Sequence, residues 1–188
     1  MKLENTFEVD APPEAAWDLL MDVPRVVPCM PGATLDETVD DSHWKATMQV
    51  KLGPIALTFA TDVSRDEVDE AGKVVKLAAQ AREVKNRGRA NATIQSSLAA
   101  LDGGRTRVDI VTDLSLSGTV AQYGRGMIQD ISSQMVTSFA ECLQAQLGTS
   151  EEAAREAVAA QAKPISGLAL FFDSVRRKLA QIFGRRPA

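Results

Sequence analysis

The imidazole and thiol groups that most often carry metal or nucleophilic chemistry are scarce in this 188-residue chain: His43, Cys29 and Cys142. A histidine-rich zinc site needs several imidazoles, so a single histidine excludes it. A Ser-His-Asp triad would depend on His43 alone. That residue lies beside the turn signal Asp40-Asp41, and we expect a solvated turn residue. Hydrolytic and metal-based catalysis are therefore disfavoured.

The two cysteines are 113 residues apart and match no metal-binding or redox motif. An iron–sulfur cluster needs about four thiolates, so these two cannot hold one. No histidine or cation adjoins Cys29 to favour its thiolate, and we assign it no nucleophilic role. We expect both thiols to be reduced, as is usual in the cytosol.

Other classes of protein are disfavoured by composition and spacing. The chain has 21 Lys and Arg against 25 Asp and Glu, a net charge of −4, which argues against nucleic acid as the main partner. Glycine-rich residues 118–126 (GTVAQYGRG) depart from the dinucleotide-binding spacing. Every 18-residue stretch contains a charge, and the N-terminus lacks the apolar core of a secretory signal, so neither a spanning helix nor a leader is expected.

The hydrophobic pattern predicts an antiparallel sheet framed by helices. Residues 2–9 form an extended segment, Pro13 opens a first helix, and residues 23–28 fit a second, short one. Apolar residues then alternate from about 34 to 116, with turn signals between the runs, which predicts about six further strands. Residues 122–147 carry apolar side chains at helical spacing. This long helix would cover the concave face of the sheet and leave a cavity beneath it.

Several short segments carry a family resemblance. The segment 13–22 (PEAAWDLLMD) resembles the START-like helix-grip superfamily. Residues 28–33 (PCMPGA), 50–55 (VKLGPI) and 117–128 (SGTVAQYGRGMI) are similar to the carbon monoxide dehydrogenase G-subunit family, over about residues 2–147. The resemblance implies an α+β helix-grip fold: a curved seven-stranded antiparallel sheet wrapped around a long C-terminal helix, with a hydrophobic tunnel between them. It also implies a non-catalytic companion of molybdenum hydroxylases such as CO dehydrogenase, implicated in attaching that enzyme to the cytoplasmic membrane.

Candidate tunnel residues come from the inward positions of this pattern. The methionines suit a ligand of variable shape, although plain core packing explains any single one as well. The loop 28–32 either shapes the tunnel entrance or only sets a turn. The predicted ligand-binding set is Cys29, Met30, Trp44, Met48, Phe59, Leu77, Ile94, Leu114, Leu116, Tyr123, Met127, Ile131 and Met135.

The C-terminus has a different character. Residues 164–188 carry five cations and one anion, whereas residues 1–163 carry 16 cations and 24 anions. Written as a helix, this tail has an apolar face flanked by cations, which is typical of a helix lying in a membrane surface; docking on a protein is the alternative. The predicted membrane-binding set is Leu168, Phe171, Phe172, Val175, Arg176, Arg177, Lys178, Leu179, Ile182, Phe183, Arg185 and Arg186.

The sequence thus predicts a helix-grip domain (1–148), an Ala-rich charged linker (149–163) and a basic amphipathic tail helix (164–188). We expect a non-catalytic accessory protein of a molybdenum CO dehydrogenase or related hydroxylase, peripheral on the inner face of the cytoplasmic membrane. Its tunnel would take a lipid or a respiratory quinone, with no covalently bound cofactor. The alternatives are a pure membrane anchor without a ligand, or a small-molecule START-like enzyme.

Overall fold

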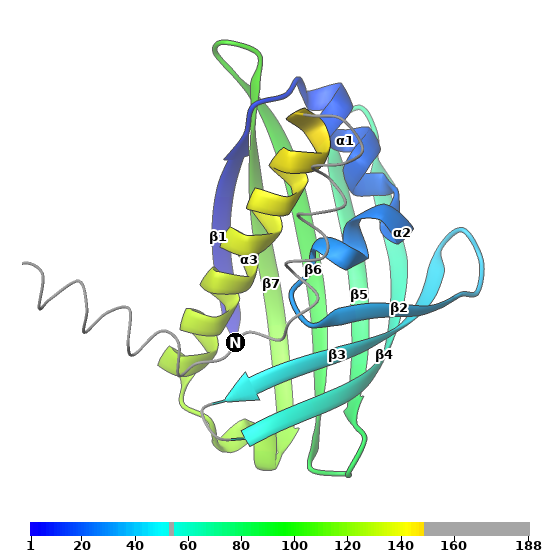
Figure 1. Cartoon of the computed structure of the whole chain (residues 1–188), viewed down its shortest axis with the longest axis vertical. Coiled ribbons are helices and arrows are strands. Elements are labelled where there is room, and N and C mark those ends of the chain that lie inside the picture. Colours follow the sequence, from blue (N-terminus) through cyan, green and yellow to red (C-terminus); the bar gives the residue numbers. More distant parts are fainter. Residues whose placement is uncertain (53–54, 149–188) are drawn as a thin grey trace, which may run out of the picture.

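The computed structural model describes residues 1–52 and 55–148, which form a curved antiparallel sheet with helices on its concave side (Figure 1). The sheet has seven strands in the order β1-β7-β6-β5-β4-β3-β2. The predicted α+β helix-grip fold is confirmed. The elements are β1 (Lys2–Val9), α1 (Pro13–Met21), α2 (Val23–Val26), the 3₁₀ turn η1 (Val27–Cys29), β2 (Ala33–Thr38), β3 (His43–Leu52), β4 (Ile55–Asp69), β5 (Val74–Glu83), β6 (Gly88–Leu101), β7 (Arg105–Gly118), the 3₁₀ turn η2 (Thr119–Gln122) and α3 (Arg125–Gly148).

The sheet curves because its strands are long and irregular. Strands β4, β6 and β7 have 14 or 15 residues each, longer than most strands in globular proteins. The pairing of β4 with β5 shifts between Arg65 and Glu67, and such an irregularity increases the local twist. Strand β1 pairs with β7, so the first strand of the chain is an edge of the sheet.

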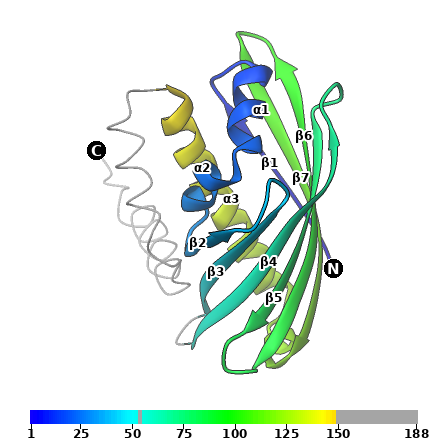
Figure 2. The ribbon, with the colours of Figure 1, turned by 90° about the vertical axis from the view of Figure 1, so that its right-hand side faces the viewer.

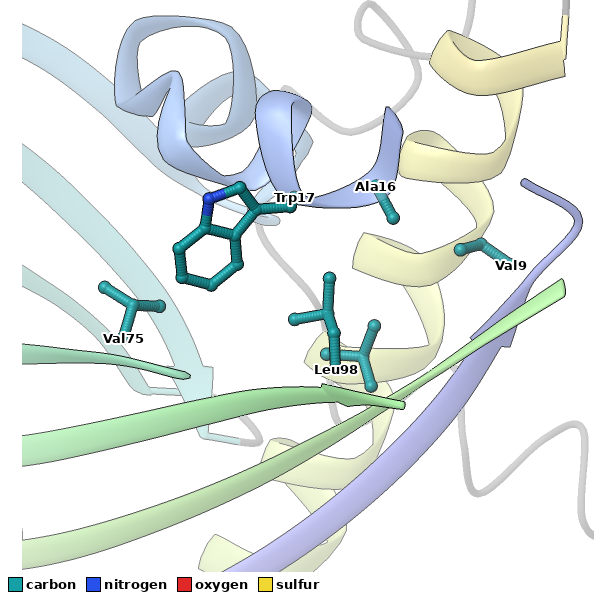
Figure 3. Packing of buried hydrophobic residues seen from close by; sticks show 6 residues of the cluster. Val9, Ala16, Trp17, Val75 and Leu98 are labelled. Atoms are coloured by element: carbon teal, nitrogen blue, oxygen red, sulfur yellow. The ribbon is translucent and has the colours of Figure 1, made fainter. Parts of the chain in front are cut away.

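Helix α1 closes one end of the concave face. Pro13 begins the helix at a position where its missing N–H is not needed. Trp17 is buried and points from α1 toward Val75 and Leu98 of the sheet (Figure 3). The ammonium group of Lys73 lies 5.3 Å from the centre of the Trp17 ring system. The indole therefore serves as the centre of the first buried cluster.

Helix α3 runs along the edge strand β1 rather than over the middle of the sheet (Figure 1). Phe139 and Phe7 meet edge to face, with ring centroids 6.2 Å apart. Asn5 Nδ2 donates a hydrogen bond to Ser132 Oγ at 3.0 Å. At the far end, the backbone N–H of Asp10 donates to Gln144 Oε1 at 2.6 Å. We call this line of contacts the α3–β1 seam.

The two cysteines form a disulfide, and the expectation that both are reduced is wrong in this structure. Cys29 of η1 and Cys142 of α3 have Cα atoms 5.4 Å apart and are bonded through sulfur. Sequence separation hid the pairing, because η1 folds back beneath the C-terminal half of α3. Gln146 Nε2 also donates to the carbonyl of Arg25 at 3.1 Å, beside the bridge. The disulfide thus joins α3 to the N-terminal helices.

The long helix begins three residues later than the sequence predicts. Residues 119–122 form the 3₁₀ turn η2 because Gly118 adopts a φ of 74°, which interrupts the path from β7. A side chain at Gly118 would lie 2.8 Å from the carbonyl oxygen of Arg87, so this glycine permits a close approach between β7 and the β5–β6 hairpin. Gly124 and Gly126, in contrast, have open space around them.

The predicted linker (149–163) and tail helix (164–188) lie outside the described residues. Within the described ranges, no helix combines the length and apolar character needed to cross a membrane.

The disulfide should contribute strongly to stability. Replacing Cys29 and Cys142 together with serine opens a loop of about 113 residues, and we expect the free energy of unfolding to fall by roughly 4 kcal/mol. Urea denaturation without reductant measures this change. The control is alkylation of denatured, unreduced wild-type protein, which should label neither cysteine; labelling of both would contradict the bridge.

Candidate functional site

The concave face has buried side chains at its margins and half-buried ones between them. Along β7, Val108 belongs to the cluster around Trp17, whereas Leu116 packs against a second group at the opposite end. Thr112 and Leu114 lie between these positions, are only half-buried, and join none of the buried clusters of the described residues. The half-buried stretch between the two clusters continues onto the neighbouring strand, since Leu114 lies opposite Ala92 and Thr112 lies opposite Ile94.

We call this region the central concave patch. Its members are half-buried, small or apolar, and contributed by three adjacent strands, β5, β6 and β7. They are Leu77, Ala79, Ala92, Ile94, Thr112 and Leu114. Apolar side chains in the middle of a concave sheet are normally fully covered, so incomplete burial here indicates a surface able to take a further apolar body.

The N-terminal half of α3 is less well packed than its C-terminal half. Phe139, Cys142 and Leu143 are buried, but no residue from Arg125 to Ser138 is. Ile131 packs against the cluster formed by Leu52, Leu57, Phe59 and Val120. Helix α3 is thus firmly held at one half only.

Two buried side-chain oxygen atoms lack hydrogen-bond partners among the described residues. One is Oγ1 of Thr61, which lies on β4 opposite Ala46 and Ala81. The other is Oε1 of Gln134, one helical turn beyond Ile131 on α3. A buried polar atom without a partner costs free energy, and native proteins usually supply one. The Thr61 hydroxyl suits a ligand oxygen atom, whereas Gln134 Oε1 only accepts and needs a ligand O–H or N–H group.

A buried ion pair closes the end of the concave face near the β5–β6 hairpin. Glu83 is fully buried, and Arg87 Nη2 donates to its Oε1 at 2.7 Å. The backbone N–H groups of Lys85 and Arg87 donate to Oε2 at 2.8 and 3.1 Å. The hydrogen bond from the Arg87 side chain, aided by these N–H groups and opposed by burial, lowers the pKa of Glu83 to about 2.

The structure brings most predicted tunnel residues to the concave side of the sheet. Met48 lies opposite Phe59, and Leu77 lies opposite Ile94. Leu114 and Leu116 follow on β7, and Tyr123 packs against the same cluster as Ile131. Met135 is half-buried on α3.

Four predicted tunnel residues lie away from the central concave patch. Trp44 is covered by Arg65, whose guanidinium carbon is 5.3 Å from its ring. Met127 is 46% exposed at the start of α3. Cys29 is fully buried in the disulfide, and Met30 packs against the cluster around it, so neither reaches the central concave patch among the described contacts.

Sequence reasoning missed three parts of this region. Thr61 fell among the alternating inward positions of its strand, but its hydroxyl was not singled out. Gln134 lies on the same face of α3 as Ile131, but its polar side chain indicated a solvent-facing position, so it was not predicted to face inward. The pairing of Glu83 with Arg87 has a weak sequence signal, an acid and a base four residues apart across a turn.

His43 is exposed, as the sequence predicts, and is the first residue of β3, beside the turn at Asp40-Asp41. Its Nδ1 lies 2.9 Å from Asp40 Oδ1 at the surface. The described residues also hold no group of three or more histidine, cysteine or acidic side chains placed to bind a metal ion.

A hollow of about 400 Å³ lies on the opposite, outer face of the sheet. Its rim is formed by outward-facing side chains of β5, β6 and β7: Ala78, Gln80, Asn91, Thr93, Asp113 and Ser115. These residues carry methyl, amide and hydroxyl groups and the single carboxylate of Asp113, so the hollow holds no paired acid and base.

Comparison with known families gives the family of this chain. The model of the carbon monoxide dehydrogenase G-subunit family (CoxG) matches residues 6–148. The chain belongs to the CoxG family. No curated protein matches the chain in sequence.

Solved structures confirm the helix-grip fold. A conserved protein from Geobacillus kaustophilus superposes with a TM-score of 0.70 at 18% identity, covering 78% of this chain and 95% of its own. A START superfamily protein from Mycobacterium smegmatis gives 0.56 at 14% identity, covering 78% and 96%. Truncated norcoclaurine synthase from Thalictrum flavum gives 0.55 at 12% identity, covering 80% and 95%. At these identities the likeness shows the fold alone.

The Glu83–Arg87 pair should make stability depend on acid pH. The folded-state pKa near 2 lies below the ordinary value of 4.5, so the stabilising contribution is complete above pH 4.5 and is lost as pH falls toward 2. Glu83→Gln should therefore lower stability at pH 7 and flatten the slope between pH 4.5 and 2. Urea denaturation across this range measures both. Glu67→Gln, which breaks the exposed pair with Lys76, is the control and should change little; equal effects would contradict the assignment.

Proposed function

We propose that this CoxG-family protein is a non-catalytic carrier of a hydrophobic ligand, and that the central concave patch forms one wall of its binding site. The observation that carries the proposal is the gap in burial between the clusters at the two ends of the sheet. Helix α3 would supply the other wall through Ile131 and Met135, because its N-terminal half is loosely packed.

The ligand that suits this wall is apolar and carries one or two oxygen atoms. Leu77, Ile94 and Leu114 offer aliphatic contact, and the partnerless oxygen atoms of Thr61 and Gln134 offer hydrogen bonds. The Thr61 hydroxyl can donate to a carbonyl, and Gln134 Oε1 can accept from a hydroxyl. A respiratory quinone offers a carbonyl to the Thr61 hydroxyl, and its reduced quinol form offers an O–H to Gln134 Oε1; a lipid with a carbonyl and a free hydroxyl offers the same pair.

A carrier role is favoured over catalysis by the chemistry of the site. Glu83, the buried carboxyl at the concave face among the described residues, is bonded to Arg87. Acid–base catalysis needs a group free to exchange a proton near the operating pH, and a carboxyl with a pKa of about 2 does not provide it. The fold itself permits catalysis, as the norcoclaurine synthase neighbour illustrates.

The family name suggests the partner, a CO dehydrogenase or a related molybdenum hydroxylase. A soluble dehydrogenase must pass its electrons to a quinone that resides in the membrane. A carrier that shields a quinone from water could present it to such an enzyme, and the predicted tail 164–188 would return the carrier to the inner face of the membrane. The disulfide is compatible with a cytoplasmic location because both half-cystines are at most 1% exposed, which hinders attack by cellular thiols.

Protein purified without detergent from its host should contain the ligand. We expect native mass spectrometry to show bound quinone or lipid, and Leu114→Trp to reduce the bound fraction about tenfold by filling the central concave patch. Val111→Trp is the matched control, since it faces outward on the same strand, and should retain the ligand. A ligand-free wild-type protein would contradict the carrier role, whereas electron transfer that survives Leu114→Trp would favour a pure anchor.

The tail should bind anionic vesicles through two separable contributions, burial of its apolar face and attraction of its cations to the lipid headgroups. Replacing Phe171, Phe172 and Phe183 with serine should weaken co-sedimentation at every salt concentration, because burial of apolar surface is lost. Neutralising Arg176, Arg177 and Lys178 should weaken it mainly at low salt, because salt screens charge. Deletion of residues 164–188 that leaves binding unchanged would instead favour a tail that docks on protein.

A further inference from the structure

Three loops meet at the end of the molecule that lies opposite α1. The first consists of residues 51–52 at the end of β3 and 55–58 at the start of β4. The second is residues 82–91 around the β5–β6 hairpin, and the third is residues 115–129, from the end of β7 into α3 (Figures 1 and 2). The N–H of Val84 donates to the carbonyl of Thr58 at 2.9 Å, and that of Thr119 donates to the carbonyl of Arg87 at 2.8 Å. We call this end the hairpin pole.

The hairpin pole is basic on an otherwise acidic domain. Of the 14 cations and 21 anions in residues 1–148, six cations but only one anion belong to it. The six are Lys51, Arg82, Lys85, Arg87, Arg89 and Arg125, and the single anion is the buried Glu83. The remaining part of residues 1–148 has eight cations and 20 anions, so the domain carries a strong charge asymmetry.

Most of these cations have no acidic partner. Apart from Arg87, none of them has a carboxylate of the described residues within 4.0 Å. Elsewhere in the described chain every lysine and arginine except Arg65 has one. Arg82 and Arg89 even lie directly opposite each other on β5 and β6, an arrangement that destabilises a sheet. Ion pairing within the fold accounts for Arg87 but not for the other five cations.

The same end presents exposed apolar side chains. Val84 is 57% exposed at the β5–β6 hairpin, Met127 is 46% exposed in the first turn of α3, and Ile55 is 38% exposed at the start of β4. These are three of the five large apolar residues that the described chain leaves exposed. Each comes from a different segment of the hairpin pole, so the three apolar side chains are separated from one another and surrounded by cations.

We infer that the hairpin pole docks on the surface of an anionic lipid bilayer, with its cations over the headgroups and Val84, Met127 and Ile55 in the interface. The charge complementarity is direct, since each cation near an anionic surface adds attraction and exposed apolar side chains add burial. The acidic remainder of the domain would be repelled, which orients the molecule with this end toward the lipid. The inference extends the proposed function but uses none of its evidence, because the tail and the ligand play no part in it.

Tryptophan placed at the tip reports insertion directly. Trp17 and Trp44 are only 3% and 4% exposed, so their emission should not respond to vesicles. In the full chain, Val84→Trp should give a blue shift with phosphatidylglycerol vesicles and little with phosphatidylcholine vesicles. Val39→Trp, 51% exposed in the β2–β3 connection, is the matched control and should not shift. No shift for Val84→Trp, or an equal shift with both lipids, would overturn the inference.

Charge removal gives the second readout. Lys85→Gln should weaken binding of the full chain to phosphatidylglycerol vesicles about fivefold at low salt. Lys45→Gln, which removes an equal charge outside the pole, should have less than about half that effect. Equal effects of the two lysine variants would reject membrane docking by the hairpin pole. The same conclusion follows if vesicle binding vanishes when Phe171, Phe172 and Phe183 are replaced with serine and Val84→Trp shows no shift. Either outcome leaves the tail and ligand proposals standing. Loss of bound ligand alone would reject only the carrier role.

Discussion

The α3–β1 seam determines the architecture of the concave side. Edge-to-face packing of Phe7 with Phe139, flanked by hydrogen bonds at Asn5 and Asp10, ties the helix to the edge strand. Because α3 is held against the edge strand and reaches β3 and β4 only near the hairpin end, through Ile131, the middle of the concave face is left incompletely covered. The half-buried side chains of the central strands follow from that placement, without any need for unusual residues in the sheet itself.

The disulfide supports one end of the seam, whereas the buried ion pair lies at the opposite end of the concave face. The bridge between Cys29 and Cys142 fixes the C-terminal half of α3 to the N-terminal helices, where the helix is buried. At the other end, Glu83 and Arg87 organise the β5–β6 hairpin, and no residue in the first turns of α3 is itself buried. A helix anchored at one half and loose at the other suits a site whose occupant must enter and leave, since regions with few buried contacts open at the lowest cost.

Much of this architecture is readable from the sequence, and the reasons are physical. Period-two alternation and turn residues predict the strands, because a half-buried sheet must alternate. Cross-strand register could not be predicted, and register decides that Thr112 and Leu114 fall between clusters. The disulfide was missed because two cysteines 113 residues apart carry no local signal. Residues such as Gln134 were missed because polarity alone indicates solvent, whereas helical phase places them inward.

The position of the disulfide has a mechanical consequence. Cys29 and Cys142 bracket every strand from β2 to β7, so these strands lie within one covalent ring. Tension between the two ends of the chain passes through residues 142–148 of α3, crosses the bridge and continues through η1, α2, α1 and β1. The ring lies off this path and cannot be extended while the bridge persists. A pull from either end would therefore strain the seam first, while the six ringed strands keep their chain path.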